Sequence, residues 1–393
     1  MTEQDDEVAT RCCPACQQNV PAAPFCGNCG AAAAVTPTRL RILLRPRTYA
    51  TAHREPVWMP RVSSTYLPRV PGPMRRPFRI GLIFVLIVVI VCAEVRLQGP
   101  GGVTATIGWP LLFLIYVWQT DVFRDIPVRI MLTAMALGVG LGVGWWLAAG
   151  KWLAGSYGVS TGSALSLTEV LNVGLAITAV GSILMLVPVA VCRLFPMRAR
   201  ESLDGFVIGA FGALWYSTAA TTTIIAPQFA EGLIEDQTSA RMLEDGISFG
   251  VVGPIVTTAA GGLAGLLLWF SPDRSRDRRG PAARKILALC AVAGMALYMA
   301  AWMVDSLGLP SFTEMAVKLG IVVLALLLVR CAIQMALLHE QPDPWTGRPV
   351  LCAHCRTVVP DMPFCSSCGA ATRASSRTSR RHLRESPPVP VPA

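Results

Sequence analysis

The chain has 393 residues, of which 53% are hydrophobic and only 15% are charged, and its mean hydropathy is +0.51. A soluble protein of this length carries about 25% charged residues. The composition therefore excludes a soluble enzyme, a disulfide-rich secreted domain and a disordered scaffold. The apolar residues fall into long blocks, which predicts a polytopic membrane protein. The net charge of +10 is spread unevenly, and its placement predicts the orientation of the chain.

Four cysteines near the start of the chain, Cys13, Cys16, Cys26 and Cys29, have the spacing C-x2-C-x9-C-x2-C. Each C-x2-C pair points two thiolates at one ion, and four thiolates form the closed tetrahedral shell of structural Zn²⁺. Such a shell leaves no open position for catalysis. A segment of about 20 residues cannot bury a useful core, so the metal must supply its folding energy. We therefore expect residues 1–35 to form a zinc ribbon.

The segment that follows, residues 36–79, carries eight prolines and ten arginines, with Glu55 as its only acid. This composition predicts an extended and mobile linker. Its charge has two interpretations, a flank that sets orientation or a strip that binds anionic lipid headgroups. Nucleic-acid binding is disfavoured because aromatic residues that could stack on bases are sparse.

Eight apolar stretches between residues 80 and 338 approach the length of about 20 residues that a membrane helix needs. They cover residues 80–95, 103–118, 130–149, 169–192, 205–226, 247–270, 285–304 and 315–337. The predicted fold class is therefore an all-α polytopic membrane protein with about eight transmembrane helices. Glycines such as Gly205, Gly209, Gly261 and Gly265 predict close contacts between these helices.

Basic residues predict which side of the membrane holds the ends of the chain. With eight spans, 29 of the 34 Lys and Arg residues fall on the side of both termini and three fall on the other side. Basic residues accumulate in cytoplasmic loops, so we expect both termini in the cytoplasm and the protein in the cell membrane.

The cysteine pattern occurs a second time near the end of the chain, at Cys352, Cys355, Cys365 and Cys368. Ten of the nineteen positions are identical between residues 13–31 and 352–370, which indicates an internal duplication. Redox cysteines or disulfides are the alternative, but a cytoplasmic location disfavours disulfides. We expect a second zinc ribbon over 339–371, two structural Zn²⁺ ions in all, and a disordered basic tail over 372–393. Whether the two ribbons stack on each other is left open.

Ionisable residues inside the spans are few. Four lie near span ends, where they can reach the interface, and two lie deeper: Glu94, Arg96, Asp204 and Asp305, then Lys318 and Arg330. No span contains a carboxylate pair suited to a proton relay, and all four histidines fall outside the spans.

Three consecutive spans contain Pro188, then Asp204-Gly205, then Pro254-Ile255-Val256-Thr257-Thr258 with Gly262. This arrangement resembles the PrsW family of intramembrane proteases, in which a proline leads EExxK, an aspartate-glycine helix carries FxxxE, and HxxxT precedes a glycine. The resemblance covers about 90 of the 393 residues.

The residues that the resemblance implies for chemistry are missing. Val189 and Ala190 stand in place of the paired glutamates, Ala220 in place of the third glutamate and Pro254 in place of the histidine. General acid–base catalysis needs groups that take and give protons. The resemblance therefore implies a degenerate core without catalytic residues, and we assign none.

Two functions remain. The first is a non-enzymatic membrane scaffold or regulator that docks a cytoplasmic protein partner through its zinc ribbons. The alternative is an unrecognised intramembrane protease or a small-solute transporter.

Overall fold

The computed structural model describes most of the chain. The residues outside its description are 1–8, 34–47, 53–54, 70–74, 96–97, 120–121, 157–166, 198–199, 232–238, 273–279, 305–306, 308, 345 and 387–393. Parts of the predicted linker and tail, and the predicted span-end residues Arg96 and Asp305, lie outside the described residues.

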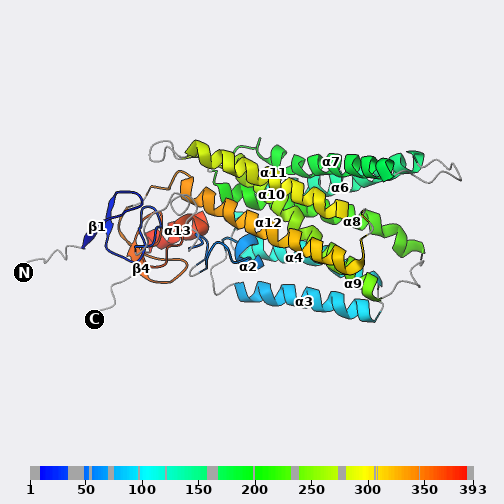
Figure 1. Cartoon of the computed structure of the whole chain (residues 1–393). Coiled ribbons are helices and arrows are strands. Elements are labelled where there is room, and N and C mark those ends of the chain that lie inside the picture. Colours follow the sequence, from blue (N-terminus) through cyan, green and yellow to red (C-terminus); the bar gives the residue numbers. More distant parts are fainter. Residues whose placement is uncertain are drawn as a thin grey trace, which may run out of the picture.

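A bundle of long helices forms the body of the molecule, and the two cysteine-rich segments lie together at one end of it (Figure 1). Seven helical segments in the described part of the chain are long and apolar enough to cross a membrane, which indicates a multi-pass membrane protein. These segments lie in α3 (Arg75–Glu94), α4 (Gln98–Gln119), α6 (Val128–Ser156), α7 (Leu167–Cys192), the continuous run of α9 (Ser239–Ile247), η2 (Ser248–Val252) and α10 (Gly253–Trp269), α11 (Gly280–Val304), and α12 (Ser311–His339).

The remaining predicted span, 205–226, lies in α8 (Ser202–Glu231). This helix is not among the seven apolar segments, because hydroxyl side chains such as Ser217 and Thr221 dilute its apolar residues. Both of these side chains are buried, so α8 meets protein over much of its surface and needs a less apolar sequence than a lipid-facing helix. The count of eight spans therefore stays a prediction.

Glycines bring α8 and α10 into backbone contact. A Cβ atom added at Gly209 would lie 2.1 Å from the carbonyl oxygen of Gly261, and one added at Gly205 would lie 2.3 Å from that of Gly265. No side chain fits in this space. The predicted close helix contacts are therefore confirmed at these four positions.

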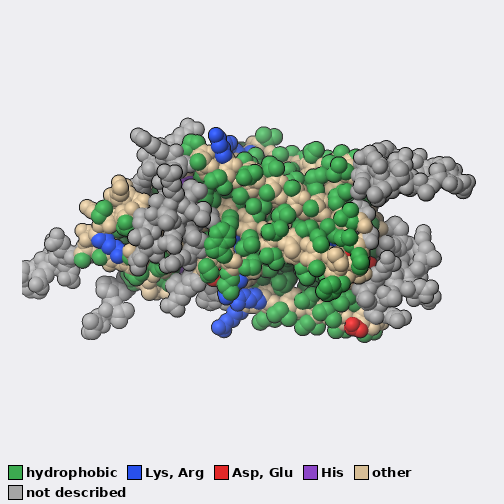
Figure 2. All heavy atoms as spheres, viewed as in Figure 1, with side chains coloured by type: hydrophobic (Ala, Val, Ile, Leu, Met, Phe, Trp, Pro, Cys, Tyr) green, Lys and Arg blue, Asp and Glu red, His purple; other side chains and the backbone are tan. Residues whose placement is uncertain are grey.

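The outer surface of the bundle is apolar and has a basic border. Large hydrophobic side chains such as Phe84, Ile183 and Leu289 are exposed there. Figure 2 shows hydrophobic side chains covering the sides of the bundle and Lys and Arg side chains gathered near the end that bears the cysteine-rich segments. Exposed apolar area on this scale suits a lipid environment.

Residues 48–52 and 55–69 do not form the extended linker that the composition predicts. Tyr49, Val57 and Tyr66 are completely or almost completely buried among the helices, and residues Val62–Tyr66 form the short helix α2. The expectation failed because the side chains of this segment pack against the helices of the bundle. The segment is therefore ordered without an apolar core of its own.

The end of the chain is also more ordered than expected. After the 3₁₀ turn η4 (Thr372–Ala374), residues Arg377–Glu385 form the helix α13, which Ser376 caps by accepting a hydrogen bond from the Ser379 amide. The predicted disordered tail is therefore wrong over residues 372–386. The arginines of α13 form ion pairs with acidic residues that are far away in the sequence.

Candidate metal centres and their attachment to the bundle

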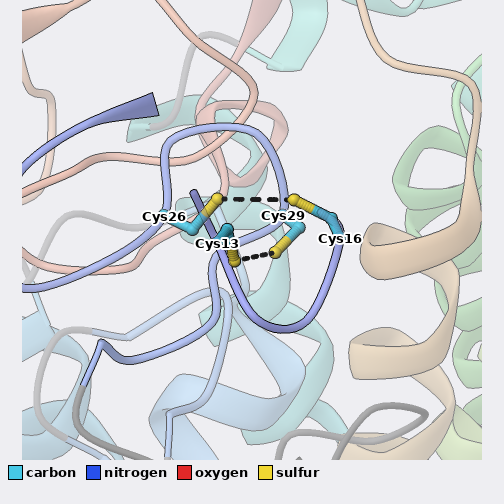
Figure 3. Close-up of side chains that lie close together, drawn as sticks. All are labelled: Cys13, Cys16, Cys26 and Cys29. Carbon is cyan, nitrogen blue, oxygen red and sulfur yellow. Dashed lines mark hydrogen bonds between the residues drawn. The ribbon is translucent and has the colours of Figure 1, made fainter. Parts of the chain in front are cut away.

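The first cysteine cluster is built on a hairpin of two short strands. Strands β1 (Thr10–Cys12) and β2 (Asn19–Pro21) pair in antiparallel fashion, with Arg11 opposite Val20. The hairpin and the following turn bring together four thiols that sequence analysis assigned as ligands: Cys13, Cys16, Cys26 and Cys29 (Figure 3).

The spacing of these sulfur atoms suits a tetrahedral ion. The Sγ atoms of Cys13 and Cys29 are 3.7 Å apart, and those of Cys16 and Cys26 are 3.8 Å apart. A tetrahedron with Zn–S bonds of about 2.3 Å has edges of about 3.8 Å. The cluster can therefore hold one metal ion without rearrangement.

The second cluster repeats this geometry. Strands β3 (Pro349–Leu351) and β4 (Val358–Pro360) form the same hairpin in the same register, with Val350 opposite Val359. The Sγ atoms are separated by 3.9 Å in one pair and 3.8 Å in the other, Cys352–Cys368 and Cys355–Cys365. All eight predicted ligands thus fall into two clusters that could each bind a metal ion.

Crowding makes the thiols of each cluster share protons, which lowers the pKa of one cysteine and raises that of its neighbour. Hydrogen bonds with the Cys26 and Cys29 thiols hold the pKa of Cys16 far below its usual range, and bonds with Cys365 and Cys368 do the same for Cys352. The hydrogen bond between Cys16 and Cys26 raises the pKa of Cys26 to about 11. A metal ion would replace the shared protons, because thiolates are the ligating form.

The two ribbons stack on each other around an approximate two-fold axis, which answers the question left open by the sequence. The Phe25 amide donates to the Ser366 carbonyl at 3.0 Å, and the equivalent Phe364 amide donates to the Gly27 carbonyl at 2.8 Å. We call this pair of ribbons, residues 9–33 and 346–372, the double-ribbon head.

Two glycines make the stacking possible. Gly30 and Gly369 have positive φ values of 69° and 75°, and each lies against the aromatic ring of the opposite ribbon. A Cβ atom at Gly30 would be 2.7 Å from Phe364, and one at Gly369 would be 2.8 Å from Phe25. Glycine is therefore required here both for the backbone conformation and for space.

A buried network of charges fixes α13 to the bundle below the head. Arg69, completely enclosed, lies 2.5 Å from Asp204 and 3.3 Å from Glu201. Arg377 of α13 pairs with both of these acids, and Arg380 pairs with Glu201. We call these five residues the junction network.

Further acids complete the attachment of α13. Asp125, at the end of α5 (Val122–Asp125), accepts hydrogen bonds from the amides of Arg377 and Thr378 at 2.7 and 3.2 Å. A carboxylate at a helix N-terminus is favourable because it meets unpaired amides and the positive end of the helix dipole. Glu340 accepts bonds from the Ser202 amide and hydroxyl and pairs with Arg373 at 3.2 Å.

Sequence analysis missed the role of these charged residues. Asp204 was expected to reach the interface, yet it is 0% exposed. Arg330, expected among the deeper residues of a span, is enclosed by residues 48–52 and 55–66. Its guanidinium donates to the Val57 carbonyl at 3.0 Å and to the Ser64 hydroxyl at 2.7 Å, and it lies over the Tyr49 ring. Glu55, the only acid in residues 36–79, pairs with Arg330 at 3.4 Å. One acid in a basic segment and one arginine inside a span were the signal from which this ion pair could have been predicted.

The other deep cation, Lys318, is also buried. Its ammonium donates to the Glu314 carboxylate at 2.6 Å and to the Ser248 hydroxyl at 2.9 Å. Ser248 begins the π-helical turn η2, and π-helical turns occur often at functional sites. This group lies toward the end of α12 opposite the head.

Comparison with known proteins adds no identity: no family model, no curated protein and no solved structure matches the chain. The resemblance of α7, α8 and α10 to the PrsW family therefore has no support beyond the residues quoted for it. In the structure these three helices do pack together. The buried side chains at the corresponding positions are Val189, Ala220 and Pro254, which carry no chemistry.

Proposed function

We propose that this chain is a non-enzymatic membrane scaffold or regulator of the cell membrane, whose double-ribbon head holds two Zn²⁺ ions and docks a cytoplasmic protein. The observation that carries the proposal is the head itself: two closed four-cysteine clusters stacked into one body at the end of an apolar bundle. A closed thiolate shell has structural rather than catalytic use. A body built this way is suited to presenting a fixed surface.

The cytoplasmic placement of the head is supported by the basic border. Arg76, Arg79, Arg284 and Lys285 are exposed at the starts of α3 and α11, at the end of the bundle that carries the head. Anionic lipid headgroups are the partners that such a border would meet.

Reporter fusions test this topology together with the span count. Fusions at residue 30, in the 227–246 loop and at residue 375 should read inside, outside and inside. An external signal from either end would reject the cytoplasmic head.

The proposal that the chain is not an enzyme rests on the side chains that peptide hydrolysis would need. Peptide hydrolysis in a bilayer requires an activated water and groups that stabilise an oxyanion. Among the described residues, the positions of the three glutamates and the histidine carry only apolar side chains, and Arg193 stands at the position of the lysine. Asp204 is committed to Arg69 and Arg377. Thr257 and Thr258 bond carbonyls of their own helix. Purified protein in lipid should not cleave membrane-anchored substrates. Cleavage that is abolished by a substitution in α7, α8 or α10 would show that the protein is an enzyme.

A specific observation supports the alternative of a small-solute transporter. A small cavity of about 20 Å³ lies between η2, α10, α11 and α12, lined in part by Tyr298, Trp302 and Lys318. Intramembrane charges often mark transport pathways. Solute uptake into proteoliposomes that Lys318→Met abolishes would favour transport over docking.

The docking function is tested by affinity capture from cells. Wild-type protein should retain a cytoplasmic partner that is lost when all eight ligand cysteines are changed to serine. Cys12→Ser is the matched control, because Cys12 lies outside both clusters and is exposed. Equal capture by wild type and the eight-serine variant would reject docking through the head.

A further inference from the structure

A groove separates the C-terminal ribbon from α13. Its cavity volume is about 40 Å³, so it is a shallow surface groove and not an enclosed ligand cleft of about 300–1,000 Å³. The side chains that line it are mostly apolar and include Val350 and Leu351 of β3, Val359 of β4 and Leu383 of α13. We call it the ribbon–α13 groove.

The duplicated ribbon shows which residues are special to this groove. The N-terminal copy has Arg11 and Cys12 at the positions of Val350 and Leu351. The metal ligands and the stacking phenylalanines are the same in both copies, so these apolar residues are not needed to form a ribbon. Their presence only in the copy that faces α13 indicates a purpose connected with the groove.

The rim of the groove is basic. Arg380 and Arg384 line it, and Asp361 is the only acid among its lining residues. Asp361 is 2% exposed and is held by Arg384 through two contacts of 3.1 Å, whereas the Arg384 side chain remains 32% exposed. Arg381 is also on α13, and its side chain is 82% exposed. Arg380 is buried and paired with Glu201 and Asp343, and Arg381 pairs with the exposed Glu385, so the exposed part of α13 beside the groove carries two arginines against one acid.

We infer that the ribbon–α13 groove is the docking site of the head and that it takes an apolar protein segment flanked by acidic residues. The inference rests on the proposed docking function and deepens it. Apolar side chains of the segment would occupy the space between β3 and α13, where buried apolar anchors contribute most of the binding energy. Acidic flanks would face the arginines of α13 and speed association.

Selection from a random peptide library displayed on phage, on the full-length protein in lipid nanodiscs, tests the inference. We expect enriched peptides with adjacent apolar residues between Asp or Glu residues. Synthetic copies should bind Leu351→Glu and Leu383→Glu at least about tenfold more weakly than wild type. Cys12→Glu, the matched change in the N-terminal ribbon, should leave binding within about twofold. Two zinc ions per chain would show that each variant retains its head.

Three results would overturn the inference. They are peptides with basic flanks, peptides that bind the Leu383→Glu protein as tightly as wild type, and no enrichment at all. Failure of the docking function itself would look different, because a captured cellular partner would then be insensitive to loss of both metal clusters. A partner that is lost when the metal clusters are removed but still binds Leu351→Glu and Leu383→Glu would reject the groove as the binding site. The docking function of the head would then stand.

Discussion

The two ribbons have the same metal shell but different places in the molecule. The N-terminal ribbon packs on the C-terminal one, through contacts such as Met362 against Gly27. The C-terminal ribbon also joins the main core through Phe364 and Ala371, and the Ala371 amide donates to the Ala50 carbonyl at 2.8 Å. Phe364 and Ala371 have identical counterparts in the first ribbon, Phe25 and Ala32, so the comparison teaches that the place of a ribbon in the molecule, and not its residue types at these positions, decides whether it joins the core.

The largest test of this comparison removes one metal at a time. Structural zinc contributes about 10–16 kcal/mol to the folding of a small ribbon, so Cys26→Ser/Cys29→Ser and Cys365→Ser/Cys368→Ser should each reduce zinc from about two ions per chain to about one. Only the second variant should also lose the core contacts of Phe364 and Ala371, because only its ribbon packs on the bundle. Elemental analysis and amide hydrogen exchange would measure the two effects. A full zinc complement in either variant would mean that its ligands are misassigned.

A smaller but still severe effect is expected from the junction network. Asp204→Asn removes one of the two acids that Arg69 and Arg377 share and leaves Glu201 to pair with both arginines. Breaking a buried ion pair costs about 3–5 kcal/mol. Thermal unfolding in detergent should show the loss, with both zinc ions retained because the ligands are untouched. Glu385→Gln, on the exposed pair with Arg381, is the control and should change stability little. Equal effects of the two substitutions would contradict the network's role.

The pH dependence of the junction gives a third test. Burial raises the pKa of Glu340 from 4.5 to about 7, against the opposing effect of Arg373; Ser202 donates to this carboxylate and Glu201 lies near it. The folded state then holds a proton that the unfolded state has lost, so stability falls as pH rises through 7. Between pH 6 and 8 this amounts to about 1.4 kcal/mol. Glu340→Gln should remove that component from melting curves; an unchanged slope would disprove it.

The smallest effect concerns a position at which both ribbons are strained alike. Gln17 and Arg356 follow the second cysteine of each ribbon and have positive φ values of 57° and 60°. A non-glycine residue in this conformation costs about 1 kcal/mol. Gln17→Gly and Arg356→Gly should each stabilise their ribbon by about this amount in chemical unfolding. A destabilised Arg356→Gly protein alone would show that the surroundings, not the backbone, decide the difference between the copies.

Sequence reasoning succeeded where the signal is local. The cysteine spacing located both metal clusters, and long apolar runs located the helices, because ligand geometry and membrane thickness each act within a short segment. It failed for residues 48–52 and 55–69 and for α13, which lack periodic apolar residues. Gln334 binds the backbone of Thr48 and Ala50 from more than 280 positions away, and Asp204 binds Arg377 across 173 positions. Only the folded chain brings such partners together.

Stacking of the first ribbon on the last also sets an order of events during synthesis. A ribosome releases residues 9–33 long before residues 346–372 exist. Until then Phe25 lacks the glycine surface at Gly369, and the acids Glu201 and Asp204 lack the arginines of α13. A nascent chain that lacks residues 346–385 thus displays an unpaired aromatic ring and an acidic site that Arg69 compensates without the arginines of α13. Synthesis of the second ribbon and α13 is therefore the step that closes both sites.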